Sequence, residues 1–265
     1  MHRKFLLTFV LFCVVCLAVS LRLEGQRAGG TIQGKIQYAG AAPKGGLISM
    51  AKDPNCLKIN AGKKVFQETL IVNPNNTIRN VFVHIKSGLP KKSYPAPAQA
   101  VTLEQKGCIY NPRVQGALVG QSLKIINNDQ TLHNVHSQSP AYLVNVAQPI
   151  AGMTYDVPLK TEEVMLIFKC EIHPWMASYV GVLAHPFYSV STATGTYEIR
   201  DVPPGKYVLQ AWQEQLGALT QPVEVTPGGV ATADFTFTSK ESAQNSPGFQ
   251  LQEVEIHDNG SPVLR

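Results

Sequence analysis

The sequence predicts an all-β protein built from two β-sandwiches. Short segments that alternate apolar and polar residues recur along the 265-residue chain, and turns rich in Gly and Pro separate them. Helical periodicity is lacking over long windows. The chain has 21 glycines and 18 prolines, which fits frequent turns, and 44% of its residues are hydrophobic. This apolar content is enough for a real core and excludes wholesale disorder.

Residues 1–20 have the features of a signal peptide. The basic start His2-Arg3-Lys4 precedes an apolar stretch, and Ala18-Val19-Ser20 fits cleavage after Ser20. An uncleaved membrane anchor is the alternative. We therefore expect export to the periplasm or out of the cell, with a linker over residues 21–30.

The expected strands fall into three groups. An N-terminal β segment (31–99) has strands at 31–38, 69–72 and 78–85, and weak periodicity over 44–64 leaves room for one short helix there. A domain over 100–186 has strands at 100–103, 109–114, 122–127, around 135, 153–157, 164–170 and 178–184. A smaller β domain follows at 187–238, with strands that include 207–212 and 221–225, and residues 239–265 are expected to be a disordered tail.

Charge and motif content exclude several functional classes. Only 15% of residues are charged, and the formal net charge is +5. Without residues 1–20, which hold two basic residues and no acid, it is +3, and so even a balance does not argue for nucleic-acid binding. The sequence has no Cys-x-x-Cys-His haem motif, no Gly-x-Ser-x-Gly, no Walker loop and no His-Glu-x-x-His, and no carboxylate pair stands out. We therefore assign no catalytic residue and expect no enzyme.

The run from Cys170 to Met176 carries the strongest chemical signal. Its spacing, Cys-x2-His-x2-Met, lies between two apolar segments, so we expect a tight loop at one end of a sandwich. Such a loop can direct a thiolate, an imidazole and a thioether at one point, and these ligands suit copper. His133, after another strand, supplies a second imidazole. His136 is the alternative, although three residues further along a strand it should face the opposite side.

Two histidines, a cysteine and a weak axial methionine form the ligand set of blue-copper electron-transfer sites. Residues 100–185 resemble the cupredoxins, in particular those with an amicyanin- or plastocyanin-like copper site, in the Cys-x2-His-x2-Met loop and in Leu132-His133-Asn134-Val135-His136. The resemblance implies a Greek-key β-sandwich holding one type 1 copper. The implied ligands are His133, Cys170, His173 and Met176, and Met153 is a distant alternative to Met176.

The same resemblance implies roles for the neighbours of the ligands. The backbone amide of Asn134 would support the Cys170 sulfur, and Pro174, which lacks an amide hydrogen, would limit hydrogen bonding near it. His136 would lie behind the ligands or at the surface. Trp175 and the exposed edge of His173 would form the surface for electron exchange.

The cysteines of the exported chain are Cys56, Cys108 and Cys170, and their spacing alone does not decide which two pair. With Cys170 assigned to copper by the resemblance, Cys56 and Cys108 are left to form a disulfide. It would tie the N-terminal segment onto the copper-binding sandwich.

Residues 187–238 resemble the transthyretin-like or carboxypeptidase regulatory-like β-sandwich. The resemblance lies in Gly195-Thr-Tyr-Glu-Ile, in Asp201-Val-Pro-Pro-Gly205 and in Tyr207 to Trp212. Residues 31–40 also look like the opening strand of such a domain. One alternative therefore stays open, in which 31–90 and 187–238 form a single sandwich with the copper-binding domain inserted.

The expected function is that of an exported blue copper protein that carries single electrons between periplasmic redox partners. Its partner would be a redox protein such as a c-type cytochrome or a periplasmic dehydrogenase. The alternative is a copper-binding or β-sandwich adhesion or interaction module without electron transfer. A third hypothesis, a small copper oxidase or reductase subunit, requires an open coordination position and so requires that Met176 is not a ligand.

Overall fold

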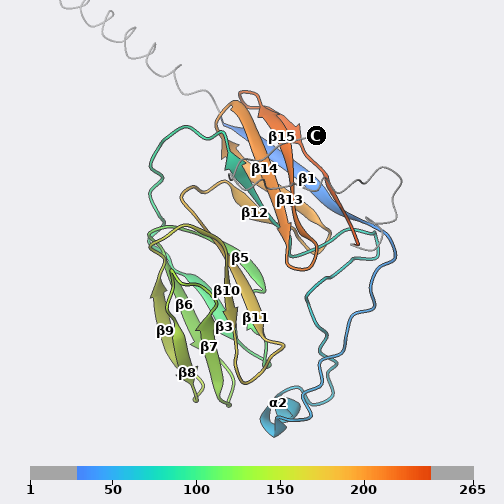
Figure 1. The fold of residues 1–265 in the computed structure, drawn as a ribbon, viewed down its shortest axis with the longest axis vertical. Helices are drawn as coiled ribbons and strands as arrows, with labels where there is room; N and C mark the ends of the chain where they lie inside the picture. The colour runs from blue at the N-terminus through green and yellow to red at the C-terminus, as the bar shows by residue number, and fades with distance from the viewer. Residues whose placement is uncertain (1–28, 240–265) are drawn as a thin grey trace, which may run out of the picture.

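A computed structural model describes residues 29–239, and it is all-β apart from one short helix. Four sheets pack as two sandwiches stacked end to end (Figure 1). We call residues 101–183 the central sandwich, because one continuous stretch of chain supplies all its strands. We call the other the split sandwich, because it takes strands from both sides of that stretch.

The central sandwich consists of a four-stranded and a five-stranded sheet. The first has the order β4-β3-β6-β9 and the second β5-β11-β10-β7-β8. Strands β3 and β6 pair in parallel, as do β5 and β11, while the other neighbours are antiparallel. Alternate residues such as Leu123, Ile125, Leu166 and Phe168 are fully buried between the sheets. The strands are β3 (Val101–Gln105), β4 (Tyr110–Asn111), β5 (Val114–Leu118), β6 (Ser122–Asn127), β7 (His133–Ser137), β8 (Asn145–Gln148), β9 (Thr154–Pro158), β10 (Glu163–Lys169) and β11 (Ala177–Leu183).

The split sandwich combines two early strands with the C-terminal part of the described chain. One sheet has the order β13-β1-β16, with β17 also pairing with β1, and the other has the order β12-β2-β14-β15. The pairs Gly34↔Tyr197 and Ala211↔Val83 show how the early and late segments are joined. The strands are β1 (Gly30–Ala39), β2 (Phe82–Ser87), β12 (Tyr188–Val190), β13 (Thr196–Val202), β14 (Gly205–Gln213), β15 (Gly217–Val225), β16 (Val230–Thr232) and β17 (Phe235–Thr238).

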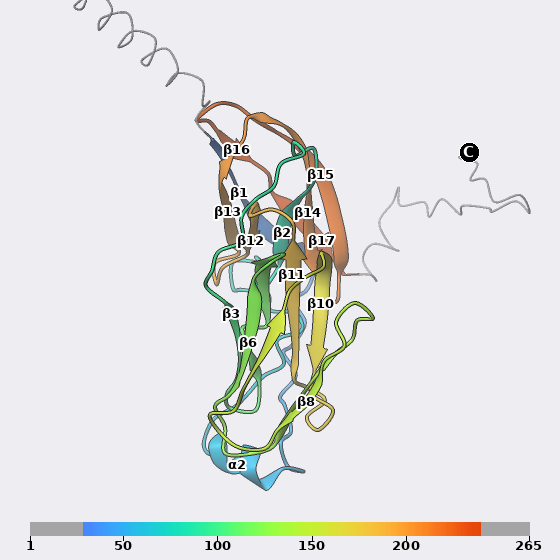
Figure 2. The same cartoon turned by 90° about the vertical axis from the view of Figure 1, so that its left-hand side faces the viewer.

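Between β1 and β2 the chain leaves the split sandwich, runs the length of the central sandwich and returns (Figures 1 and 2). At the far end it forms helix α2 (Pro54–Ile59). Asp53 caps this helix by accepting a hydrogen bond from the Cys56 amide at 2.8 Å, and Pro54 occupies the first helical turn, where its missing N–H costs nothing. We call residues 47–66 the cap. The backbone bond from Ile48 N to Val65 O, 2.9 Å, closes its base.

The two sandwiches meet at a small apolar junction. Phe82 is fully buried there, and its ring fills the space over Gly181, where an added Cβ would lie 2.2 Å from the ring. Glu214 accepts two hydrogen bonds from Arg113, both 2.7 Å, and both side chains are 8% exposed. The junction therefore combines aromatic packing with a bidentate ion pair.

The structure corrects some expected strands. Residues 69–72 form no strand and contribute only a bridge between Val72 and Ile78. The strand expected at 109–114 is divided into β4 and β5, and β8 was not predicted. The expected leader (1–20) and nearly all of the expected tail (239–265) lie outside the described residues. Within residues 29–239, no helix has the length and apolar character to cross a membrane.

Candidate metal centre

Strand ends bring three of the predicted copper ligands together at the end of the central sandwich farthest from the split sandwich. His133 begins β7, Cys170 follows β10, and His173 lies in the turn before β11. The antiparallel pairing of β7 with β10 places these ends side by side. The Nδ1 atoms of His133 and His173 are 3.1 Å apart, and the Cys170 Sγ lies 3.7 Å from the His173 Nδ1. One ligand atom from each residue lies within 4.8 Å of the others.

The candidate site is buried. Exposed fractions are 0% for His133, 3% for Cys170 and 1% for His173. Met176 is also 1% exposed and belongs to the same core cluster as Cys170. Its amide donates to the His173 carbonyl at 2.9 Å, and its carbonyl accepts from the Cys170 amide at 3.2 Å, which closes the loop. Met153, by contrast, is 37% exposed.

Each histidine contacts a carboxylate through Nε2, the ring nitrogen that points away from the cluster. His133 Nε2 lies 2.9 Å from Asp129 Oδ2, and His173 Nε2 lies 2.9 Å from Asp53 Oδ2. Asp129 also accepts hydrogen bonds from the amides of Gly107 and Cys108, both 2.8 Å. With Nε2 engaged in this way, the two Nδ1 atoms lie close to each other, and that of His173 also lies close to the Cys170 sulfur. Carboxylates placed behind imidazoles fix ring orientation and raise ligand basicity.

The Cys56–Cys108 disulfide joins the two segments that carry or support these aspartates. Cys56 follows Asp53 in α2, and the amide of Cys108 binds Asp129. The Cys56 Sγ lies 3.4 Å from the His173 Nε2. The predicted disulfide is thus present, and it packs directly against the candidate site.

The charge balance of the cluster favours a thiolate. Burial raises the pKa of the Cys170 thiol, but hydrogen bonds with His133 and His173 and with the amides of Asn134 and His173 outweigh it, so the pKa is lowered to about 6. Burial lowers the pKa of both histidines, whereas Cys170 and the two aspartates raise it, and the net direction is upward. Because metals bind the thiolate, a lowered thiol pKa prepares the site for a soft metal ion.

The neighbouring residues take distinct places. The Asn134 amide bonds the Cys170 sulfur, and the Asn134 side-chain oxygen accepts from the Glu171 amide at 3.3 Å. His136 faces away from the site, where its Nδ1 lies 2.6 Å from a Glu171 carboxylate oxygen. Pro174 is exposed in the turn.

The prediction that His173 and Trp175 form an exposed surface for electron exchange is wrong, because neither side chain is exposed. His173 is 1% exposed because Asp53 and Cys56 of the cap cover its outer edge. Trp175 is half-buried against the disulfide, and its indole N–H donates to the Cys108 carbonyl at 2.7 Å. The covering segment comes from 120 residues earlier in the chain, so the local motif gave no sign of it.

Sequence reasoning missed Asp53 and Asp129. Asp129 lies four residues before His133 in a polar turn, and Asp53 precedes a proline. The aspartate–proline pair could have signalled a helix start, but neither residue carried a signal that pointed to a histidine partner.

The donor set fits copper. One thiolate and two imidazole nitrogens converge in a dry site, and a buried thioether closes the same loop. Copper sites of the blue type use this combination of soft and intermediate ligands. Two further groups, Asp53 with Cys56 and His173, and Cys108 with Asp129 and His133, also lie close enough for a metal, but their cysteines are joined in the disulfide.

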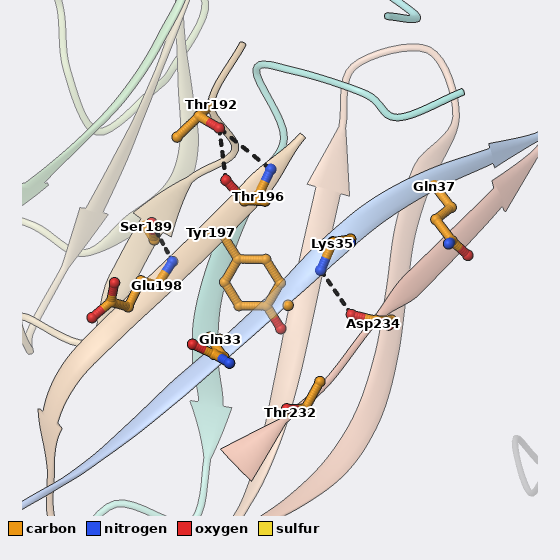
Figure 3. Close-up of a pocket in the computed structure, with 11 residues that line it drawn as sticks. Gln33, Lys35, Gln37, Ser189, Thr192, Thr196, Tyr197, Glu198, Thr232 and Asp234 are labelled. Atoms are coloured by element: carbon orange, nitrogen blue, oxygen red, sulfur yellow. Dashed lines mark hydrogen bonds between the residues drawn. The ribbon is translucent and has the colours of Figure 1, made fainter. Parts of the chain in front are cut away.

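A hollow of about 630 Å³, lined mainly by polar residues, lies elsewhere, on the split sandwich (Figure 3). Side chains of β1, β13 and the β16–β17 region line it. Several polar groups around it bind their own sandwich: Lys35 N donates to Asp234 Oδ1 at 2.8 Å, and Tyr197 OH donates to the Ala233 carbonyl. These bonds hold the segment between β16 and β17 against β1 and β13.

Comparisons with known proteins give limited likenesses. A family model for domain II of polysaccharide lyase family 4 matches residues 185–233. No curated protein matches the sequence. Among solved structures, the chain is similar to the copper-containing nitrite reductase NirK from Thermus scotoductus SA-01, with 18% identity, 36% of this chain covered and a TM-score of 0.28. The match spans only 25% of the length of that reductase.

Two further similar structures are a purple cupredoxin and an amicyanin. The purple cupredoxin from Nitrosopumilus maritimus matches at 20% identity over 31% of this chain and 98% of its own, with a TM-score of 0.27. The M98A mutant of amicyanin with Cu(I) matches at 21% identity over 38% of this chain and 97% of its own, again with a TM-score of 0.27. At these scores the likenesses carry no functional assignment, and the metal-binding capacity rests on the geometry of the site.

Proposed function

We propose that this chain is an exported type 1 copper protein that carries single electrons between redox proteins. The observation that carries the proposal is the convergence of His133 Nδ1, His173 Nδ1 and the Cys170 thiol in a buried cluster. Copper bound there would supply a one-electron couple. Met176 would be the weak fourth ligand.

The residues of the chain would keep the site rigid and dry. The Asp129 and Asp53 carboxylates fix the two imidazole rings, and backbone amides hold the Cys170 sulfur. A site whose ligands cannot rearrange suits electron transfer, because little reorganisation then accompanies the change of charge. Four ligands from the protein leave no open position for a substrate, which is why we propose a carrier and not an enzyme.

The first test is the visible absorption spectrum of residues 21–265 after addition of Cu(II). We expect an intense blue thiolate-to-copper band that is lost in Cys170→Ser. His133→Gln should lose or strongly shift the band, whereas the matched control His136→Gln should keep it. A blue Ser variant, or a wild type that binds Cu(II) without the band, would refute the proposal.

A second candidate function is copper binding without electron transfer. The cover over His173, which is 1% exposed, favours it. Voltammetry of the copper-loaded protein separates the two. Reversible, fast one-electron waves support the carrier, and slow or absent waves with ready exchange of copper to a chelator support a copper-binding module.

We further propose that the protein works in the periplasm or outside the cell, as its N-terminal sequence and its disulfide suggest. The partner would be a redox protein such as a c-type cytochrome or a periplasmic dehydrogenase. Fractionation of the producing cells, with detection of the mature N-terminus by mass spectrometry, checks the compartment.

A further inference from the structure

We infer that the cap is the surface through which electrons reach the metal centre, and that it fits an electron-transfer protein with an acidic docking face. The inference rests on the proposed function and specifies its partner. It begins from the burial of His173, because the histidine edge that was expected to meet the partner is covered by residues 47–66.

The cap offers a short route to one of the ligands. Asp53 Oδ2 and Cys56 Sγ lie 2.9 and 3.4 Å from His173 Nε2, so this ligand touches the cap directly. Electron-transfer rates fall exponentially with distance, so a partner gains most by docking where the chain between surface and ligand is thinnest. The opposite end of the central sandwich is covered by the split sandwich (Figure 2).

The cap is strongly basic. Its charged residues are four exposed lysines, Lys52, Lys58, Lys63 and Lys64, and a single acid, Asp53. Asp53 is bound to His173, and within residues 29–239 none of the four ammonium groups pairs with a carboxylate. Lys106, also exposed, adjoins this surface because Asn60 donates to the Gly107 carbonyl at 2.9 Å. The charge is therefore free to act on an approaching partner.

Exposed apolar side chains adjoin the disulfide and the two candidate histidine ligands. Leu57 in α2 is 49% exposed and adjoins Cys56, Leu132 is 41% exposed and adjoins His133, and Ile172 is 43% exposed and adjoins His173. The Asn55 side chain donates to Thr131 Oγ1 at 3.2 Å, which holds α2 against the His133 segment. One exposed acid, Glu171, also lies here, next to Ile172. A few apolar groups among mainly basic charges suit the small, transient interfaces of redox proteins. The lysines would steer an acidic partner and raise its association rate.

The experiment measures oxidation of the reduced, copper-loaded protein by two small probes of opposite charge. One electron passes to hexacyanoferrate(III), which becomes hexacyanoferrate(II), or to tris(1,10-phenanthroline)cobalt(III), which becomes its Co(II) form; no bond changes in either case. In Lys58→Glu/Lys63→Glu we expect the rate with the anionic probe to fall by about tenfold or more at low salt, and the rate with the cationic probe to rise. The matched control Lys35→Glu/Lys206→Glu, on exposed lysines of the split sandwich, should change neither rate appreciably.

Thermal unfolding and the visible spectrum of each variant show that fold and site are intact. Equal sensitivity of the cap and control variants, or no sensitivity in either, would overturn the proposed docking surface. Cap-dependent sedimentation with phosphatidylglycerol vesicles, combined with unchanged probe rates, would overturn it in favour of a membrane surface. A copper-loaded wild type without the blue band refutes the proposed function itself, whereas a blue protein whose rates ignore cap charge refutes only the docking surface.

Discussion

The two sandwiches differ in how the chain supplies their strands. The central sandwich takes all of its strands from residues 101–183 and carries the candidate metal ligands on its strand ends, while the split sandwich is assembled from segments on both sides of it. The excursion between β1 and β2 belongs to the split sandwich, yet its tip covers the candidate metal site of the central sandwich. One region thus supplies the candidate ligands, and a segment of the other covers and orients one of them, His173.

Breaking the junction between the sandwiches should have the largest effect. Phe82→Ala removes a fully buried ring that packs over Gly181, and we expect a loss of about 3–5 kcal/mol in the free energy of unfolding. Denaturant unfolding measures it. Phe66→Ala, at a residue that is 50% exposed in the cap, is the control and should change stability little. Equal losses in both variants would contradict the assignment of the junction.

Removing the link between the cap and the central sandwich should have the next largest effect. The disulfide joins residues 52 positions apart, and Cys56→Ser/Cys108→Ser should cost about 2–4 kcal/mol, largely through the unfolded chain. We also expect faster reaction of the buried Cys170 with a thiol reagent, because the cover over His173 loosens. Unchanged Cys170 reactivity would show that the other cap contacts hold the cover without the disulfide.

A smaller change should come from the carboxylate that the cap contributes. Asp53→Asn keeps the shape but weakens the hold on His173, and we expect Cu(II) affinity to fall by about 10- to 100-fold. Competition with a chelator measures this. Asp234→Asn, a carboxylate that binds the Lys35 amide in the split sandwich, is the control. An affinity that is equal to wild type in Asp53→Asn would mean that the cap only covers the site.

The smallest expected effect is a pH dependence of the split sandwich. Burial lowers the pKa of His84, which is 4% exposed on β2, below its usual value of about 6.5, although its bond to Gln210 opposes this. The unfolded chain therefore binds the proton more readily, and stability falls as the pH drops through about 6.5 toward the lowered folded pKa. The slope is at most about 1.4 kcal/mol per pH unit. His84→Gln should flatten it in unfolding curves between pH 5 and 8, while a slope equal to wild type would exclude His84 as its source.

The all-β class and the close approach of Cys170 and His173 could be predicted because each depends on local pattern. The approach of His133, from 37 residues earlier in the chain, was expected from the resemblance to a known family. Alternating segments read as strands, and a Cys-x2-His turn places its two side chains together whatever lies outside it. The burial of His173 could not be predicted in this way. It depends on Asp53 and Cys56, which reach the site through an excursion whose periodicity is weak.

The local sequence pattern also failed to predict which short segments pair as strands at the edges of the sheets. β8 and the bridge at Val72 depend on which neighbour is available for pairing, and a short segment carries little information about its partner. The joining of β1 with β13 was an open alternative in the sequence, because the resemblance of residues 31–40 to an opening strand did not say which sheet would accept it.

The pairing of β2 with β12 has a consequence for how the molecule folds. His84 lies opposite Tyr188, so these strands close a loop of roughly 100 residues, and ordering so long a loop is costly in chain entropy. If the central sandwich folds first, the ends of that loop are already near each other and the remaining search is short. Refolding should then show the split sandwich forming after the central sandwich. A newly made chain would therefore bring its candidate ligands together before the split sandwich is complete.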